Sequence, residues 1–124
     1  DEKSDDLFGI FHCFTGNFDQ AKQAISYNMK LGIGGVVTFK NGKIDQFINQ
    51  IDLKHIVLET DAPYLAPKPF RGKRNESSYL NFTCQKVAEI LDLNINIFEY
   101  RFFFVWISKA DILKSNVTFN LFKI

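Results

Sequence analysis

Short apolar runs alternate with amphipathic stretches along most of the chain. Leu7 to Phe11, Leu31 to Val37 and Ile56 to Leu58 are nearly continuous in apolar residues, as is typical of short strands buried on both faces. Between these runs, apolar residues recur at helical spacing: Phe18, Ala21, Ala24 and Ile25 behind the candidate N-cap Asn17, and then Ile44, Phe47, Ile48 and Ile51. The alternation predicts parallel βα units.

A long loop and a further predicted helix follow the third apolar run. The loop holds all three prolines and extends to Glu76. A helix is expected from about Ser77 to Leu91, with an apolar side made of Leu80, Cys84, Val87, Ile90 and Leu91. The aromatic segment at 98–107 has little periodicity, so a buried strand, an insertion and misread sequence stay open as alternatives. Helical spacing returns over 110–124.

Three βα units are too few to close a barrel, and three bare parallel strands make a poor independent sheet. The chain also begins with Asp1, and its sole methionine is Met29. We therefore expect residues 1–124 to form a single, partial domain of a longer protein.

Composition and charge narrow the function classes. Apolar residues make up 46% and charged residues 23% of the chain, which is typical of a globular domain. The net charge of +1 excludes a global nucleic-acid signature, so anion binding has to be local. Two cysteines make no disulfide framework, which favours a cytoplasmic setting, with the nucleus as an alternative. No apolar run approaches the roughly 18 residues of a membrane span, and we expect no membrane partner.

Candidate catalytic chemistry lies at the ends of two predicted strands. His12 directly follows the first apolar run, and Asp61 closely follows the third. Either residue alone is more often structural, but together imidazole and carboxylate can bind a divalent metal ion and activate water. Glu59 shares a strand face with Asp61. It is either a metal ligand, a group that orients a histidine ligand, or a buried carboxylate paired with a base.

The loop at 71–76 is the best candidate anion site. Arg71, Lys73 and Arg74 surround Gly72, and guanidinium and ammonium groups suit phosphate oxygens. A solvated charge run is the alternative interpretation. Cys13 adjoins His12, but neighbours along a strand point to opposite faces, so we do not expect a Cys–His nucleophile pair.

Four motifs, in order, resemble those of the TatD-family metal-dependent deoxyribonucleases. FHCFTG at 11–16 resembles the HCF(S/T)G motif of the family, and LGIGGVVTFK at 31–40 resembles its glycine-rich stretch. LETDAPYLAP at 58–67 matches its ETDAPYL signature, and RGKRNE at 71–76 matches its basic block. The resemblance is good over 8–91, whereas 92–109 diverge and 110–124 loosely resemble the terminal helix of the family.

The resemblance implies an α/β fold, the C-terminal portion of a TIM-type (β/α)8 barrel of the metal-dependent hydrolase type. About three βα units plus a terminal helix would lie in this chain. The implied activity is hydrolysis of phosphodiester bonds of DNA, as a 3′–5′ exonuclease in the complete enzyme. The implied partner is DNA, as single strands or ends. The cofactor would be a divalent metal, Mg²⁺ first and Mn²⁺ or Zn²⁺ as alternatives, with two ions in the complete site.

The resemblance also implies roles for individual residues. His12 and Asp61 correspond to metal ligands, and Asp61 and Glu59 to catalytic residues. The substrate contacts would be Arg71, Lys73, Arg74 and Asn75. The N-terminal His-x-His pair, the bridging glutamate and the earlier histidine of the family have no counterpart here, so another chain or an N-terminal half would have to supply them. Two rival hypotheses are a catalytically incomplete fragment that retains nucleic-acid or partner binding, and a related hydrolase of a different ester or amide.

Overall fold

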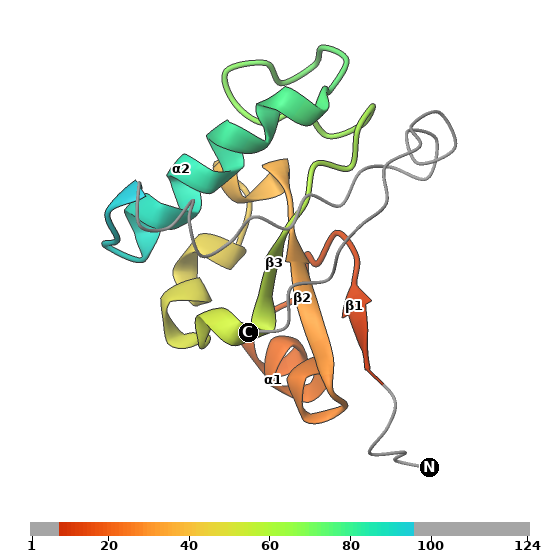
Figure 1. Ribbon diagram of the computed structural model, residues 1–124, viewed down its shortest axis with the longest axis vertical. Coiled ribbons are helices and arrows are strands. Elements are labelled where there is room, and N and C mark those ends of the chain that lie inside the picture. The colour runs from red at the N-terminus through yellow and green to blue at the C-terminus, as the bar shows by residue number, and fades with distance from the viewer. Residues whose placement is uncertain (1–7, 96–124) are drawn as a thin grey trace, which may run out of the picture.

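Three parallel strands form the sheet of the computed structural model, which describes residues 8–95. They are β1 (Gly9–Phe11), β2 (Met29–Ile33) and β3 (Ile56–Leu58), in the order β1-β2-β3 (Figure 1). Gly9 pairs with Met29, and Leu31 pairs with Ile56. The prediction of parallel strands is confirmed, and all three carboxyl ends lie at one edge of the sheet.

Helix α1 (Phe18–Ser26) connects β1 to β2 and packs against β2. Its first turn is closed by a capping box, in which the Gln20 backbone N–H donates to the Asn17 side chain and the Asn17 N–H donates to the Gln20 side chain, both at 2.9 Å. Ala21 and Ala24 are buried on its inner face. The predicted helix and its Asn17 cap are confirmed.

The second predicted strand is shorter than expected at its carboxyl end. β2 ends at Ile33, and a 3₁₀ turn, η1 (Gly35–Thr38), follows where a strand was predicted to reach Val37. The chain turns here against the long loop: a Cβ added to Gly35 would lie 2.5 Å from the carbonyl oxygen of Leu65. Val37 is buried all the same, so its apolar character marks core rather than strand.

The second predicted helix is not an α-helix. Two 3₁₀ turns, η2 (Ile44–Gln46) and η3 (Ile48–Gln50), occupy this stretch, and a third, η4 (Leu53–His55), leads into β3. The apolar residues of the predicted helix are nonetheless all buried. Successive 3₁₀ turns repeat every three residues, so they bury nearly the same positions as a helix and produce a similar pattern.

Burial of the first strand on both faces was a wrong prediction. Phe11 is 52% exposed and Ile10 39% exposed, whereas all of β3 is buried. Within residues 8–95, β1 is an edge strand that pairs only with β2. Both side chains are therefore partly open to solvent, although the Phe11 ring packs edge-on against Phe14.

Helix α2 (Leu80–Ile90) follows a 3₁₀ turn, η5 (Ser77–Tyr79), and packs against η1 and β3. Thr83, Cys84, Val87 and Ala88 are buried, which confirms the helix predicted from about Ser77. Within the described part of the chain, no helix has the length and apolarity needed to span a membrane. The aromatic segment at 98–107 and the predicted terminal helix at 110–124 lie outside the described residues.

Candidate metal centre

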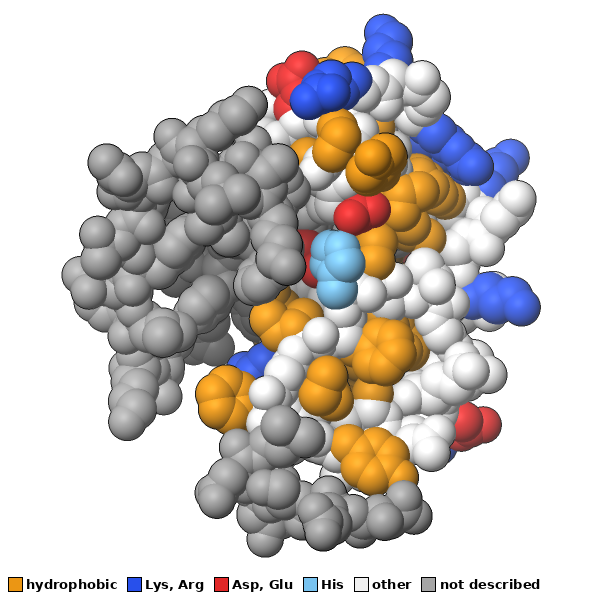
Figure 2. Space-filling view, turned by 90° about the vertical axis from the view of Figure 1, so that its right-hand side faces the viewer, with side chains coloured by type: hydrophobic (Ala, Val, Ile, Leu, Met, Phe, Trp, Pro, Cys, Tyr) orange, Lys and Arg blue, Asp and Glu red, His pale blue; other side chains and the backbone are white. Residues whose placement is uncertain are grey.

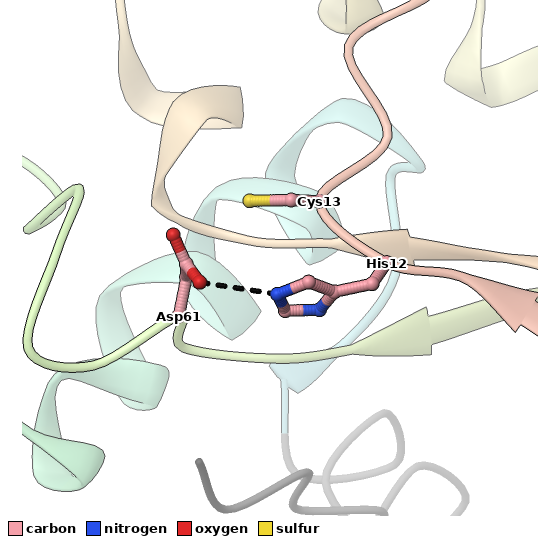
Figure 3. A group of neighbouring side chains, drawn as sticks. All are labelled: His12, Cys13 and Asp61. Carbon is pink, nitrogen blue, oxygen red and sulfur yellow. Dashed lines mark hydrogen bonds and ion pairs between the residues drawn. The ribbon is translucent and has the colours of Figure 1, made fainter. Parts of the chain in front are cut away.

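His12 and Asp61 meet at the carboxyl edge of the sheet (Figure 3). His12 directly follows β1 and Asp61 follows β3, so the central strand β2 separates their backbones. The Nε2 atom of His12 lies 3.1 Å from Oδ1 of Asp61. The structure thus brings together two side chains that are 49 residues apart in sequence.

Glu59 holds the other side of the imidazole ring. Its Oε2 lies 2.7 Å from Nδ1 of His12, and its Oε1 accepts a hydrogen bond from the backbone N–H of Cys13. Because a carboxylate only accepts, the Glu59 contact requires a proton on Nδ1 and the Asp61 contact requires one on Nε2, which a metal ion bound there would displace. Glu59 is only 1% exposed, so it orients His12 from within the sheet edge.

The glycine-rich stretch makes room for this carboxylate. A Cβ added to Gly32 would lie 2.5 Å from Oε2 of Glu59, well inside van der Waals contact. The backbone N–H of Glu59 donates to the carbonyl of Ile33 at 3.0 Å, which continues the ladder of β3 beside β2. Gly32 therefore lets the buried carboxylate approach β2 closely enough to reach His12.

Cys13 lies on the same side as His12, contrary to the strand-alternation prediction. β1 ends at Phe11, and Cys13 has a φ of +54°, in the left-handed region. One ligand atom each from His12, Cys13 and Asp61 lie within 4.8 Å of one another. Alternation between faces holds only inside a strand, and two residues beyond its end it no longer applies.

The carboxylates set the protonation of their neighbours. Burial lowers the pKa of His12, but the hydrogen bonds and charges of Glu59 and Asp61 outweigh this and raise the pKa above its ordinary value. Burial and the charges of Asp61 and Glu59 raise the pKa of Cys13 to about 12. Without a metal ion, Cys13 is therefore a neutral thiol and a poor nucleophile, in keeping with the expectation that no Cys–His nucleophile pair operates.

The donor set fits a divalent ion. Bonds of about 2.0 to 2.2 Å to one ion put two adjacent nitrogen and oxygen ligands about 3 to 3.5 Å apart, and the His12–Asp61 separation of 3.1 Å lies in that range. Imidazole, carboxylate and thiolate are all established ligands of divalent metals. His12 and Asp61 are also partly open to solvent, with side chains 48% and 24% exposed.

The basic loop is exposed throughout its cationic part. Arg71, Lys73 and Arg74 all face solvent, and Gly72 between them has a φ of +85°. The Arg71 guanidinium stacks over the Phe39 ring at 4.2 Å from its centre. Figure 2 shows lysine and arginine side chains along the margin of the face whose centre holds a histidine beside an acidic side chain.

Asn75 is placed differently from these cations. It is 2% exposed, and its Nδ2 donates to the carbonyls of Thr60 and Tyr64, at 2.5 and 2.6 Å. It therefore ties together the loop that carries Asp61, a positioning role that sequence reasoning missed because a buried amide in a charged loop leaves no periodic pattern. Its predicted contact with substrate stays a prediction.

Comparison with known proteins adds three findings from sequence. The family model described as "TatD related DNase" matches residues 1–102. The chain is 40% identical over 94 residues to the uncharacterized metal-dependent hydrolase YabD of Bacillus subtilis. This aligned region covers 75% of this chain and 37% of YabD. It is 33% identical over 89 residues to the uncharacterized metal-dependent hydrolase YcfH of Escherichia coli, covering 71% of this chain and 34% of YcfH.

Solved structures show the same relationship. The TatD homologue YjjV of Escherichia coli is 26% identical and superposes with a TM-score of 0.69 over 74% of this chain and 36% of YjjV. A TatD-family hydrolase from Entamoeba histolytica, 18% identical, shares the fold with a TM-score of 0.67, over 77% of this chain and 39% of that protein. The prediction of a partial TIM-type barrel is confirmed, and the chain spans just over a third of the length of these relatives.

Proposed function

Because the chain belongs to the family of TatD-related DNases, we propose that it supplies part of the active site of a divalent-metal-dependent hydrolase. The observation that carries this proposal is the meeting of His12 and Asp61 at the carboxyl edge of parallel strands, with 3.1 Å between their ligand atoms. That edge is where barrel enzymes place their catalytic residues. Relatives at 40% and 33% identity are named metal-dependent hydrolases.

In this proposal, His12 and Asp61 hold one ion. Glu59 fixes the imidazole through Nδ1, so that the Nε2 lone pair faces the ion and not the protein interior. A bound ion would polarise a phosphoryl oxygen and lower the pKa of a bound water. The family resemblance favours Mg²⁺, with Mn²⁺ or Zn²⁺ as alternatives and two ions in the complete site.

The proposed substrate is DNA, cleaved at its phosphodiester bonds, from 3′ to 5′ at single strands or ends. Three exposed cations, Arg71, Lys73 and Arg74, support this choice because they suit phosphate oxygens. Stacking on Phe39 holds the Arg71 guanidinium in place before substrate arrives. We place the protein in the cytoplasm or, as an alternative, the nucleus, because neither Cys13 nor Cys84 is in a disulfide.

A catalytically incomplete fragment is the second candidate, and the number of ligands favours it. One catalytic zinc ion already takes about three protein ligands, so the two ions of the complete site need more than the three candidate ligand groups that converge within residues 8–95. The missing ligands would come from another chain or from a preceding half of the protein. Without them, the basic loop would still bind nucleic acid.

A chimera tests the proposed function. The 94-residue part of YabD that matches this chain is replaced by the corresponding part of this chain, and hydrolysis of labelled single-stranded DNA is measured with Mg²⁺ or Mn²⁺. We expect metal-dependent cleavage by the chimera and none by its Asp61→Ala variant. An exposed acidic residue away from the edge, changed in Asp45→Ala, is the matched control and should leave cleavage intact.

Two results would contradict the proposal. If YabD cleaves DNA and the folded chimera does not, this chain lacks a working half-site and the incomplete-fragment hypothesis is favoured. If both proteins hydrolyse only other esters or amides, the DNA assignment is wrong while the metal-dependent chemistry stands.

A further inference from the structure

We propose that Cys13 is a third ligand beside His12 and Asp61, and that its sulfur makes the site select Zn²⁺ over Mg²⁺. The inference rests on the proposed function, because it takes the metal site at His12 and Asp61 as its starting point. It assigns a new residue to that site and chooses among the ions that the site could hold.

The geometry points to the sulfur. The ligand atoms of His12, Cys13 and Asp61 converge within 4.8 Å, and Figure 3 shows the sulfur projecting into the space beside Asp61 and the imidazole ring. Bond lengths of about 2.3 Å to sulfur and 2.0 Å to nitrogen place such ligands about 3.6 Å apart in a tetrahedral zinc site. Because no two of the three ligand atoms lie more than 4.8 Å apart, a shift of at most about an ångström would bring each pair to this spacing.

The backbone holds Cys13 in this position. Its N–H donates to the same Glu59 carboxylate that orients His12. One buried carboxylate therefore anchors the imidazole of one candidate ligand and the main chain of the next. The φ of +54° carries Cys13 out of the line of β1, so that two consecutive residues reach the same ion site.

Ligand chemistry then decides the ion. Mg²⁺ prefers oxygen ligands in octahedral geometry and keeps several waters. Thiolate and imidazole favour Zn²⁺, and a Cys, His and Asp set with one open position matches the three-ligand pattern of catalytic zinc sites. Binding would replace the S–H bond of Cys13 and the Nε2–H bond of His12 by bonds to the metal, with one proton released from each to solvent.

Cobalt is the probe, because Co²⁺ occupies zinc sites and reports its ligands by absorption. The purified 124-residue chain is titrated with Co²⁺ while its near-ultraviolet and visible spectrum is recorded. We expect a sulfur-to-cobalt charge-transfer band together with visible d–d bands of low coordination. In Cys13→Ser the charge-transfer band should vanish while d–d bands from His12 and Asp61 persist.

Measured metal affinities and a control variant at the second cysteine complete the test. Cys13→Ser should lower the affinity for Zn²⁺ by at least about tenfold and leave the affinity for Mg²⁺ unchanged. The other cysteine, Cys84, is buried in α2, and Cys84→Ala should keep the charge-transfer band. Far-UV circular dichroism of each variant shows that it is folded, and Cys13→Ala replaces Cys13→Ser if that variant is not.

The outcomes separate this inference from the proposed function. Perturbed d–d bands with no charge-transfer band in the unchanged chain would overturn the sulfur ligand and leave the His12–Asp61 site standing. A charge-transfer band that survives Cys13→Ser and disappears in Cys84→Ala would also overturn it. No change in the Co²⁺ spectrum at all would overturn both the sulfur ligand and the metal site of the proposed function.

Discussion

Gly32→Ala, which adds one methyl group, should displace the buried Glu59 carboxylate and so weaken the candidate metal centre. The Cβ of Gly32→Ala would lie 2.5 Å from Oε2 and 2.9 Å from Cδ of Glu59, whereas ordinary contact begins at 3.4 Å. The carboxylate would have to move by about 0.9 Å to relieve the overlap. It is held by His12 at 2.7 Å and by the backbone N–H of Cys13, so it cannot move without losing one of these bonds.

The expected magnitude follows from these contacts. Overpacking a close-packed site costs about 1 to 3 kcal/mol, and a lost hydrogen bond to a charged group costs about 1.5 to 3 kcal/mol. Movement of the carboxylate relieves the overlap but breaks a hydrogen bond, so the two costs do not add in full. We therefore expect the free energy of unfolding to fall by about 2 to 4 kcal/mol. A urea dependence of about 2 kcal/mol per molar, in the middle of the range for small proteins, turns this into a midpoint lower by about 1 to 2 M. Metal affinity should fall by about 10- to 100-fold, since His12 loses its orienting partner.

Urea unfolding followed by circular dichroism, with Co²⁺ titration of the folded protein, measures both effects. Gly34→Ala is the matched control: its Cβ would meet no atom closer than 3.5 Å, and its φ of −112° suits any residue. The reasoning is refuted if Gly32→Ala unfolds at the same urea concentration as Gly34→Ala and binds Co²⁺ equally well.

Three further variants test separate parts of the account. Asn75→Ala should lower the free energy of unfolding by about 1 to 3 kcal/mol, because two buried loop carbonyls would lose the hydrogen bonds that the Asn75 amide donates. A urea midpoint equal to that of Arg74→Ala, a change at an exposed neighbour, would contradict this. Arg74→Ala in the active chimera should raise the KM for DNA more than it lowers kcat. An unaltered KM would show that Arg74 makes no contact with DNA and would favour the interpretation of the loop as a solvated charge run. Glu59→Gln should lower the pKa of His12 in metal-free protein, because the charge and hydrogen bond of Glu59 help to raise it; NMR titration of the His12 imidazole checks this, and an unmoved pKa would count against the contact.

Much of the fold was predictable because its signals are local. Asn17 with Gln20 three residues later forms a capping box, and the structure shows both of its hydrogen bonds. The Ile56–Leu58 run predicts the start of β3, since a short continuous apolar run fits a strand buried on both faces. The prediction that the strand continues to Asp61, with Glu59 and Asp61 on one face, was wrong, because β3 ends at Leu58 and Asp61 has a left-handed φ of +56°. By contrast, the apolar spacing at 44–51 reports burial and not helix type, so it fits two 3₁₀ turns as well as one α-helix.

The candidate site was predictable in part. The positions of His12 and Asp61 after strands of one parallel sheet are enough to predict that they meet. The place of Cys13 depends on where β1 ends and on one left-handed φ, and neither leaves a pattern in a single sequence. The dependence of Glu59 on Gly32 is likewise a contact across β2, which only the strand register reveals.

The most direct test of the central claim is a Mn²⁺ titration of the chain followed through its two histidine side chains. His12 lies at the carboxyl edge of the sheet, whereas His55, the other histidine, precedes β3 at the opposite end of the strands. Paramagnetic broadening falls steeply with distance, so His55 is an internal control. We predict that the His12 imidazole signals broaden at Mn²⁺ concentrations that leave His55 sharp, and that Asp61→Asn raises the concentration required. Equal broadening of both histidines, or broadening of His55 alone, would contradict a metal site at His12 and Asp61.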